Sequence, residues 1–356
     1  MNILLLVNEL RSTCGVTNHI LHLSRGLVQT GNVNLWIICG GGNGINRFSD
    51  INVNIISDER FLHLTRTFSG YISAINFLVK FTRQNEIDVL HSHYHYGAAI
   101  ARRASQLTSG RTVQTNHGIL EAIGRLKHFN ADKYAAINEH IRKYIIENKI
   151  ANESNIAFIR CGIPVPDKMP EKPVRDKIKV LAASRFTHEK GLDLFINAVN
   201  RLPEEILERA SFYIAGEGEL ESKLKEQNAA AGSKVIFPGK VPDMNSYLES
   251  VHVLVNPTRS DNEGFPAIIT EAGAANALVI SSDFRGSEDI LDSGKNCLKF
   301  KSGSAAELAV LLEKVLTDYE RYKLLSENFY KLVKKEYSIS TMIEKHISLY
   351  QNCLKK

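Results

Sequence analysis

The chain has 356 residues, a length that favours two α/β domains over a single hydrophobic core. With 44% hydrophobic and 23% charged residues and a net charge of +5, it has the composition of a folded globular protein. No segment holds the ~18 uncharged apolar residues that a transmembrane helix needs. Five scattered cysteines without a Cys-x-x-Cys pair predict a reduced protein in the cytoplasm.

The positive charge is concentrated in the first part of the chain. Residues 1–165 contain 17 Lys or Arg against 11 Asp or Glu, whereas the remaining residues carry a net charge of −1. This excess favours an anionic partner such as phospholipid headgroups or a phosphorylated lipid acceptor, and it fits a role in solubility equally well. We expect no nucleic-acid partner.

Continuous apolar runs alternate with amphipathic segments from the start of the chain. The first run lacks the basic region of a signal peptide, and the alternation predicts a parallel sheet covered by helices on both faces, the α/β class. The predicted strands are Ile3–Val7, Leu35–Cys39, Val53–Ile56, Val89–His93, Thr112–Thr115, Tyr134–Ile137 and Ile156–Phe158. The predicted helices are His19–Gln29, Ser69–Gln84, Gly97–Leu107 and His140–Asn148.

A proline-rich segment, Gly162–Pro173, then interrupts the pattern. Its four prolines exclude a helix or a central strand, so we expect an interdomain linker here, with domains at 1–166 and 167–337. The second series of strands is Lys179–Ala183, Ser211–Ala215, Val235–Phe237, Val253–Val255 and Leu278–Ser281. Its helices are Leu192–Leu202, Leu220–Ala231, Met244–Glu249, Ala267–Ala275 and Ala305–Val315, and two more helices are predicted in the tail from Tyr319.

The loop after the first strand, Val7–His19, stands where a nucleotide-binding fold has a phosphate-facing loop. It lacks the Gly-x-Gly-x-x-Gly pattern, which argues against a dehydrogenase. The glycine-rich residues 40–44 follow the second strand, and we expect them to form a flexible surface loop rather than a phosphate site.

Several histidines follow strands of the first domain. His91, His93 and His95 alternate along a strand end, so their side chains can share one face and bind a metal ion. No carboxylate or cysteine stands near them in the sequence, which disfavours a zinc site. His117 follows the next strand, and the adjacent Gly118 permits close approach of the backbone to a ligand.

Two cations, Arg185 and Lys190, lie in the loop that joins the first strand of the second domain to its helix. The planar fork of Arg185 and the compact charge of Lys190 suit a diphosphate. The chain has no Asp-x-Asp metal motif, and the nearest match is Glu217-Gly218-Glu219. We therefore expect chemistry without a metal ion or other cofactor.

Two glutamates, Glu263 and Glu271, stand with seven residues between them around the turn Gly264-Phe265-Pro266. Proline suits the first position of a helix, and the amides from Ala267 onward, with the helix dipole, form an anion site. Glu263 can accept hydrogen bonds from sugar hydroxyls. Glu271, inside the helix, can bind a second diol such as a ribose.

This string resembles the Glu-x7-Glu signature of retaining glycosyltransferases of family four, and the similarity extends over nearly the whole chain. The resemblance implies the GT-B fold, in which two Rossmann-like domains face each other across a cleft. It also implies that the last helix, about 338–356, packs back on the N-terminal domain. The N-terminal domain would bind the acceptor and the C-terminal domain the nucleotide-sugar donor.

The resemblance also implies roles for single residues. Arg185 and Lys190 match the family's Ser-Arg-x-x-x-x-Lys-Gly pattern and would bind the donor diphosphate, whereas His117 would lie near the donor sugar. Gly15 matches one glycine of a pair that lets the backbone approach the donor phosphate. Cys14 replaces the other glycine of that pair.

Two loops of the second domain are implied in the same way. The backbone at Lys240 and Val241 would contact the nucleobase, and uracil suits such recognition. Gly216 matches another loop of the cleft. Cys161 stands where the family has an asparagine, a departure with no interpretation.

These residues predict a retaining, metal-independent hexosyltransferase. It would move a hexose-type sugar from a nucleotide-diphosphate sugar, with a UDP-sugar favoured, to a hydroxyl of a glycan or lipid-linked acceptor. We expect this activity to serve bacterial cell-surface polysaccharide, lipopolysaccharide or glycolipid synthesis. A nucleotide-sugar epimerase on the same fold and a non-catalytic nucleotide-sugar-binding protein remain as alternatives.

The sequence also suggests a membrane contact. Ile119–Phe129 has apolar residues at helical spacing beside Arg125 and Lys127, and could lie in an anionic headgroup layer at the inner face of the cytoplasmic membrane. The alternative is a helix that packs on its own domain.

Overall fold

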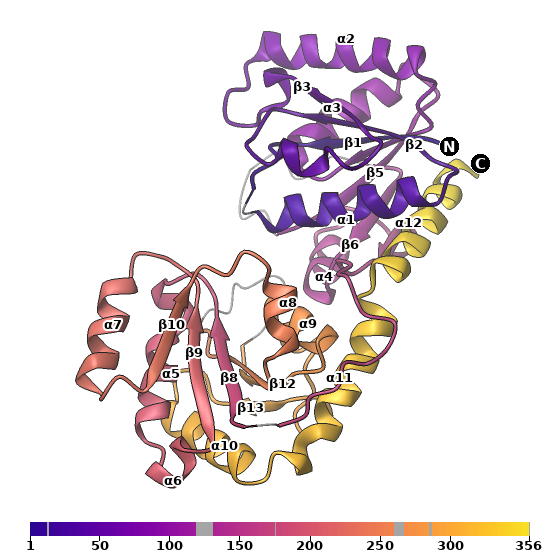
Figure 1. Ribbon diagram of the computed structural model, residues 1–356. Helices are drawn as coiled ribbons and strands as arrows, with labels where there is room; N and C mark the ends of the chain where they lie inside the picture. The colour runs from indigo at the N-terminus through magenta and orange to yellow at the C-terminus, as the bar shows by residue number, and fades with distance from the viewer. Residues whose placement is uncertain (13, 119–130, 175, 260–266, 285–286, 356) are drawn as a thin grey trace. The chain divides into compact units, whose positions relative to one another are not determined.

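The chain folds as two compact units, and a computed structural model describes its residues 1–12, 14–118, 131–174, 176–259, 267–284 and 287–355. The first unit consists of Met1–Gly162 and Tyr337–Lys356, and the second of Ile163–Glu336 (Figure 1). The N-terminal segment of the first unit therefore ends at Gly162, whereas the sequence predicted a boundary at residue 166. No helix in the described ranges is long and apolar enough to cross a bilayer.

The first unit contains a sheet of seven parallel strands in the order β3-β2-β1-β4-β5-β6-β7. All seven predicted strands are present: β1 (Asn2–Val7), β2 (Asn34–Cys39), β3 (Asn54–Ser57), β4 (Val89–Ser92), β5 (Arg111–Asn116), β6 (Lys133–Ala136) and β7 (Ile156–Phe158). The almost wholly apolar β1 is buried on both faces, as its continuous hydrophobic run requires.

Helices cover both faces of this sheet. They are α1 (Gly15–Gln29), α2 (Phe68–Gln84), α3 (His95–Ser105), α4 (Glu139–Glu147) and α12 (Ile339–Leu354). Side chains of β1 alternate between the two faces. Ile3, Leu5 and Val7 pack with α1 and α12, whereas Leu4 and Leu6 pack with α2 and α3.

The last helix, α12, belongs to the first unit and lies beside α1 (Figure 1). Gly26 of α1 permits this approach, because a Cβ there would lie 2.4 Å from the Ile343 side chain. His91 of β4 ties α12 to the sheet. Its Nδ1 lies 2.8 Å from the Tyr350 hydroxyl of α12, and its Nε2 lies 2.8 Å from the Thr115 hydroxyl of β5.

The second unit contains a sheet of six parallel strands in the order β10-β9-β8-β11-β12-β13. The strands are β8 (Ile178–Ala183), β9 (Ala210–Ala215), β10 (Val235–Gly239), β11 (Val253–Asn256), β12 (Leu278–Ser282) and β13 (Leu298–Phe300). The helices are α5 (Leu192–Asn200), α6 (Glu204–Leu207), α7 (Glu221–Ala230), α8 (Met244–Glu249), α9 (Ala267–Ala274), α10 (Ala305–Thr317) and α11 (Lys323–Glu336). The sequence did not predict β13, because Lys299 interrupts its apolar residues, whereas the equally short β7 is an apolar run.

The proline-rich segment after Gly162 packs on the second unit. The Pro166 carbonyl accepts a hydrogen bond of 2.7 Å from the Tyr330 hydroxyl, and the Pro170 carbonyl accepts one of 2.8 Å from the Asn276 side chain. Lys172 buries its ammonium group against two carbonyls at the end of α8, and burial lowers its pKa to about 8. The predicted linker is therefore attached to the second unit along much of its length.

The prediction that residues 40–44 form a flexible surface loop was wrong. Gly40 and Gly44 are buried, and the loop exchanges backbone hydrogen bonds with the segment after β1 through Leu10. A Cβ at Gly42 would lie 2.1 Å from the Leu10 carbonyl oxygen. The glycines thus permit close packing of two backbones, and they brace the loop that leads into α1.

Candidate functional site

Both sheets reverse their strand order once, between β1 and β4 in the first unit and between β8 and β11 in the second. Loops at the carboxyl ends of strands diverge at such a reversal and leave a crevice, which is where ligands bind to open α/β sheets. We therefore ask which of the polar residues predicted from the sequence lie in the loops that flank these two reversals.

In the second unit, Arg185 and Lys190 lie in the loop between β8 and α5, directly at the reversal. The Arg185 side chain is exposed and, within the described residues, forms no ion pair. Its fork of N–H donors can therefore bind a phosphate. Lys190 is half-buried at the end of a short 3-10 helix.

Arg259, which follows β11, fastens this loop from the other side of the reversal. Its guanidinium donates two hydrogen bonds of 2.7 Å to the Asp193 carboxylate, and its backbone N–H donates to the Glu189 carbonyl at 2.7 Å. Burial of Asp193 alone would raise its pKa, but the two bonds and the charge of Arg259 together lower it. The Arg259 guanidinium is thus engaged by Asp193, whereas the Arg185 guanidinium on the neighbouring loop is exposed.

Glycine is required where this loop meets the one after β11. Gly191 adopts φ +65°, and a Cβ there would lie 2.0 Å from the Pro257 carbonyl oxygen. Any larger residue would combine a strained left-handed backbone with a steric clash. Gly191 therefore fixes the distance between the two loops that border the reversal.

Gly216, after β9, is held against the same loop. It adopts φ +137°, and a Cβ would lie 2.0 Å from the Ser184 carbonyl oxygen. Phe186 donates a backbone hydrogen bond to the Glu217 carbonyl at 2.9 Å, and Gly216 donates one to the Gly239 carbonyl at 2.9 Å. The loops after β8, β9 and β10 thus form one connected rim.

Lys240 and Val241 follow β10 at the end of this rim. The Lys240 ammonium pairs with the Glu217 carboxylate at 2.7 Å, and both side chains are more than half exposed. Glu217, part of the nearest match to a metal-binding Asp-x-Asp, is therefore engaged by a cation. The backbone at Lys240 and Val241 stays a predicted contact for a base.

Glu271 lies in α9, which runs between β11 and β12. Burial raises the pKa of its carboxyl, and no cation pairs with it in the described part of the chain. Such a group can accept hydrogen bonds from a ligand diol. Ala267 is exposed at the described start of α9, whereas Glu263, Gly264, Phe265 and Pro266 lie outside the described residues.

In the first unit, five histidines from different elements gather at the reversal between β1 and β4. They are His19 of α1, His91 of β4, His93 and His117 after β4 and β5, and His346 of α12. The ring centroids of His19 and His117 are 4.9 Å apart, and those of His93 and His117 are 5.4 Å apart. His93 Nδ1 lies 3.1 Å from His117 Nε2.

Burial keeps this cluster of imidazoles neutral. It lowers the pKa of His117 and of His346 to about 4, and it lowers the pKa of His19, His91 and His93 well below the ordinary value. His346 Nδ1 lies 2.9 Å from the Met342 carbonyl, so Nδ1 carries the proton and Nε2 offers a lone pair. Each neutral ring can accept one hydrogen bond and donate another.

The histidines that alternate in sequence do not form one site. Both nitrogens of His91 are satisfied within the core, and His95 turns to Gln114 at 3.2 Å. Within the described ranges, the group that could hold a metal ion is His19, His93 and His117, whose ligating atoms lie within 4.8 Å of one another. Zinc would need these nitrogens roughly 3.4 Å apart, given Zn–N bonds of ~2.0–2.1 Å.

The predicted phosphate-facing loop ends at Gly15, the first residue of α1. Cys14 stands at the N-cap and provides no side-chain hydrogen bond to the helix start. A Cβ at Gly15 would meet no atom within 4 Å. Gly15 thus leaves space beside backbone N–H groups, a local geometry that suits an anion.

Sequence reasoning missed three residues of these two crevices. His19 and His346 looked like ordinary residues of amphipathic helices, since no motif connects them to His117. Arg259 stood beside a predicted strand without a motif. A signal existed only for His19, which begins the helix after the phosphate-facing loop. The predicted membrane segment Ile119–Phe129 lies outside the described residues.

Two family models match the chain in sequence. The model described as Glycosyltransferase Family 4 matches residues 13–165, and the model described as Glycosyl transferases group 1 matches residues 166–332. The O-antigen biosynthesis glycosyltransferase WbnH of Escherichia coli is 26% identical, over 69% of this chain and 72% of its own. The capsular polysaccharide biosynthesis glycosyltransferase CapM of Staphylococcus aureus is 21% identical, over 91% of both chains.

Solved structures match over almost the whole length. A glycosyltransferase from Rickettsia africae superposes with a TM-score of 0.84 at 18% identity, covering 99% of both chains. HepE from Anabaena, in complex with UDP, superposes with a TM-score of 0.81 at 14% identity, covering 99% of this chain and 100% of HepE. The predicted GT-B fold is thereby confirmed.

The close approach at Gly191 leads to a stability prediction. Gly191→Ala should lower the free energy of unfolding by at least about twice as much as Gly303→Ala. Both glycines have a positive φ, which costs alanine ~1 kcal/mol, but only Gly191 also faces a backbone oxygen. Calorimetry of the two variants measures the difference, and equal losses in melting temperature would contradict the steric argument.

The neutral imidazoles lead to a prediction about pH. Because the folded pKa of His346 lies below its unfolded value, the unfolded chain binds the proton first, and stability falls as the pH drops from about 6.5 towards 4. His346 alone accounts for about 3 kcal/mol of this loss. His346→Gln should flatten the decline in melting temperature, whereas His140→Gln, at an exposed position, should not. A decline of equal slope in both variants would rule out this account.

Proposed function

Because this chain belongs to the family 4 glycosyltransferases, we propose that it transfers a hexose-type sugar, with retention of configuration, from a nucleotide-diphosphate sugar to an acceptor hydroxyl. A UDP-sugar is the favoured donor. The reaction requires no metal ion. HepE, with a similar fold, is known in complex with UDP, which supports the choice of uridine.

The observation that carries this proposal is the arrangement of charge at the reversal of the second sheet. Arg185 stands exposed beside Lys190 on one loop, and Arg259 and Gly191 fix that loop against its neighbour. The half-buried Glu271 follows in α9. Two cations for a diphosphate and a carboxylate for a ribose diol correspond to the parts of a nucleotide-diphosphate sugar.

The chemistry follows from stabilising the leaving group. As the bond between the sugar anomeric carbon and the diphosphate oxygen breaks, negative charge develops on the diphosphate. Arg185, Lys190 and the amides from Ala267 onward stabilise that charge, which is the role a metal ion has in other transferases. The acceptor oxygen bonds to the anomeric carbon on the same face, and its proton passes to the departing phosphate oxygen. Glu263 and Glu271 hold the sugar and ribose hydroxyls.

The histidine cluster supplies neutral polar groups for a sugar. His117 is neutral at pH 7 because burial lowers its pKa to about 4, so it can donate a hydrogen bond to a sugar hydroxyl without adding charge. His19 has both ring nitrogens buried without a partner among the described residues. Gly15 leaves room at the start of α1 for the donor phosphate.

The printed names of the relatives indicate the class of acceptor. WbnH is named for O-antigen biosynthesis and CapM for capsular polysaccharide biosynthesis. By analogy, this chain would extend a glycan or lipid-linked acceptor for the bacterial cell surface. It would work in the cytoplasm, in peripheral contact with the anionic membrane.

A screen of nucleotide sugars by thermal shift identifies the donor, because a ligand that binds only the folded chain raises its melting temperature. The stabilising donor is then incubated with and without glycan acceptors. We expect a new glycoside and free nucleoside diphosphate. Conversion of the donor to its epimer without an acceptor would instead identify an epimerase, and binding without turnover a sensor.

The proposed roles predict how variants divide between binding and turnover. Lys190→Ala and Glu263→Ala should each lower kcat by at least about a hundredfold, because they act on charge or sugar position in the transition state. Glu271→Ala should mainly raise the KM for the donor. Steady-state kinetics measure kcat and KM for the three variants, and unchanged melting temperatures serve as the control. Normal turnover by Lys190→Ala would refute the proposed site.

Metal removal tests the remaining element of the proposal. Activity should persist in EDTA, because Arg185 and Lys190 would replace a metal ion at the diphosphate. The purified chain should also contain no stoichiometric zinc. Metal analysis is paired with the His19→Ala variant. Loss of activity in EDTA, restored by a divalent ion, would show metal-dependent chemistry, and zinc that disappears in His19→Ala would place it in the histidine cluster.

A further inference from the structure

We propose that the start of α2 and the residues before it form a docking surface for an anionic lipid bilayer. This docking surface comprises the exposed side chains of residues 60–83 in the first unit. The inference rests on the proposed function and deepens it, because it names the surface through which the chain would reach a lipid-linked acceptor. It differs in place from the predicted membrane segment at 119–129.

Large apolar side chains are exposed close together in sequence at this surface. Leu64 is 85% exposed, Phe68 is 81% exposed and Ile72 is 43% exposed. Phe68 and Ile72 stand one helical turn apart and therefore lie on one side of α2. Single exposed apolar residues are common, but a group of them marks an interaction surface.

The hydrophobic core does not require this side of α2. The helix already buries Ala74, Ile75 and Leu78 in the cluster that contains Leu4 and Leu6 of β1. Its start is also capped, since the Thr67 hydroxyl accepts a hydrogen bond from the Gly70 N–H at 3.0 Å. Phe68 and Ile72 thus remain exposed on a helix whose start is capped and whose other side is packed, and Leu64 is exposed in the segment just before it.

Charge complementarity points to an anionic partner. No Asp or Glu occurs between Glu59 and Glu86, whereas Arg66, Lys80 and Arg83 do. Arg60 is neutralised by Asp58, and its guanidinium lies 4.6 Å from the ring centroid of Phe77. Three cations therefore remain uncompensated within this stretch.

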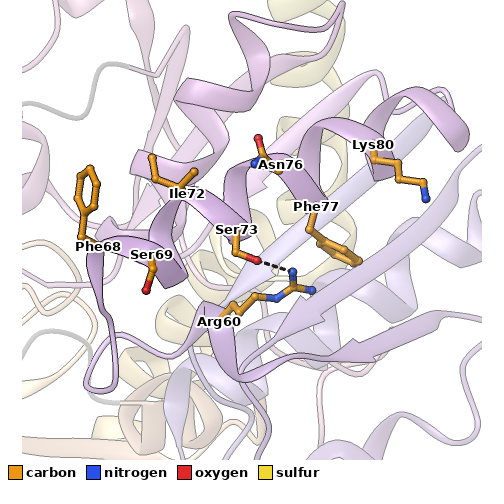
Figure 2. Close-up of a pocket in the computed structure, with 8 residues that line it drawn as sticks. All are labelled: Arg60, Phe68, Ser69, Ile72, Ser73, Asn76, Phe77 and Lys80. Carbon is orange, nitrogen blue, oxygen red and sulfur yellow. Dashed lines mark hydrogen bonds between the residues drawn. The ribbon is translucent and has the colours of Figure 1, made fainter.

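The shape of the surface favours a bilayer over a folded partner. Figure 2 shows Phe68, Ile72 and Lys80 along α2, with Arg60 beside Ser73 and Phe77. These residues line an open hollow of about 670 Å³. Lipid tails adapt to such a shallow, open surface. The apolar side chains would lie at the acyl boundary and the cations at the phosphates. A free anion would gain nothing from Leu64 or Phe68.

Vesicle flotation tests the proposal on the full chain. Wild type should float with vesicles of phosphatidylcholine and phosphatidylglycerol at low salt, and much less with phosphatidylcholine alone. The double variant Leu64→Ser/Phe68→Ser should bind at least about tenfold more weakly, because it removes the apolar anchors. Arg66→Gln/Lys80→Gln should weaken binding about 25-fold, at roughly fivefold per cation, and ~0.5 M salt should abolish this difference.

A matched control is Leu324→Ser, at a position 61% exposed in the second unit, which should float like wild type. All variants should keep the wild-type melting temperature, because the altered side chains are exposed. The proposal is overturned if wild type does not bind anionic vesicles at low salt, if Leu64→Ser/Phe68→Ser binds as well as wild type, or if inorganic phosphate displaces the chain far more than sodium chloride of the same ionic strength does. The stabilisation by UDP, measured on the same variants, reports donor binding separately.

Discussion

The reversal of strand order in each sheet is the constraint on which both candidate sites depend. Because all strands are parallel, their carboxyl ends meet at one edge of the sheet, and only at the reversal do neighbouring loops diverge. Arg185 follows β8 and Arg259 follows β11, so the two arginines flank the reversal of the second sheet. His93 follows β4 in the first sheet, and His19 lies in the helix after β1. Connectivity therefore selects which loops carry chemistry before any side chain is considered.

Close contacts between backbones then set the positions of these loops. Gly191 and Gly216 bring three loops of the second unit together, and Gly42 does the same for the loop before α1. At each of these glycines a Cβ would clash with a backbone oxygen of the neighbouring loop. The close approach of the loops therefore requires a residue without a side chain. Arg259 adds a charged clamp across the reversal. Its pairing with Asp193 explains why two nearby arginines have different roles.

Much of this architecture could be predicted, because buried parallel strands are continuous apolar runs and β1 and β8 are both runs of this kind. In β13 a lysine interrupts the apolar run, so the strand was not predicted. The glycines at 40–44 indicated flexibility, whereas they permit close packing of two backbones. Motif and position agree in placing Arg185 and Lys190 at the reversal of the second sheet, and their role in donor binding stays a prediction. His19 and His346 were missed because no local pattern shows which side chains of α1 and α12 meet His117, and His346 is more than 200 positions away from it in sequence. Sequence patterns report local periods, whereas this cluster is a product of tertiary structure.

The histidine cluster is costly for stability unless something binds it. Four ring nitrogens of His19, His93 and His346 are buried without a protein partner among the described residues. An unsatisfied buried polar group costs ~1–3 kcal/mol, so four of them compare with the whole stability of a domain, ~5–15 kcal/mol. Apolar side chains at these positions would avoid the cost, as Leu5 and Ile37 do in the same core. Hydroxyl groups of water or of a sugar both donate and accept, so they satisfy neutral imidazoles in either tautomer, whereas a metal ion uses only the lone pairs. The cluster therefore suits a hydroxyl-bearing partner better than a cation.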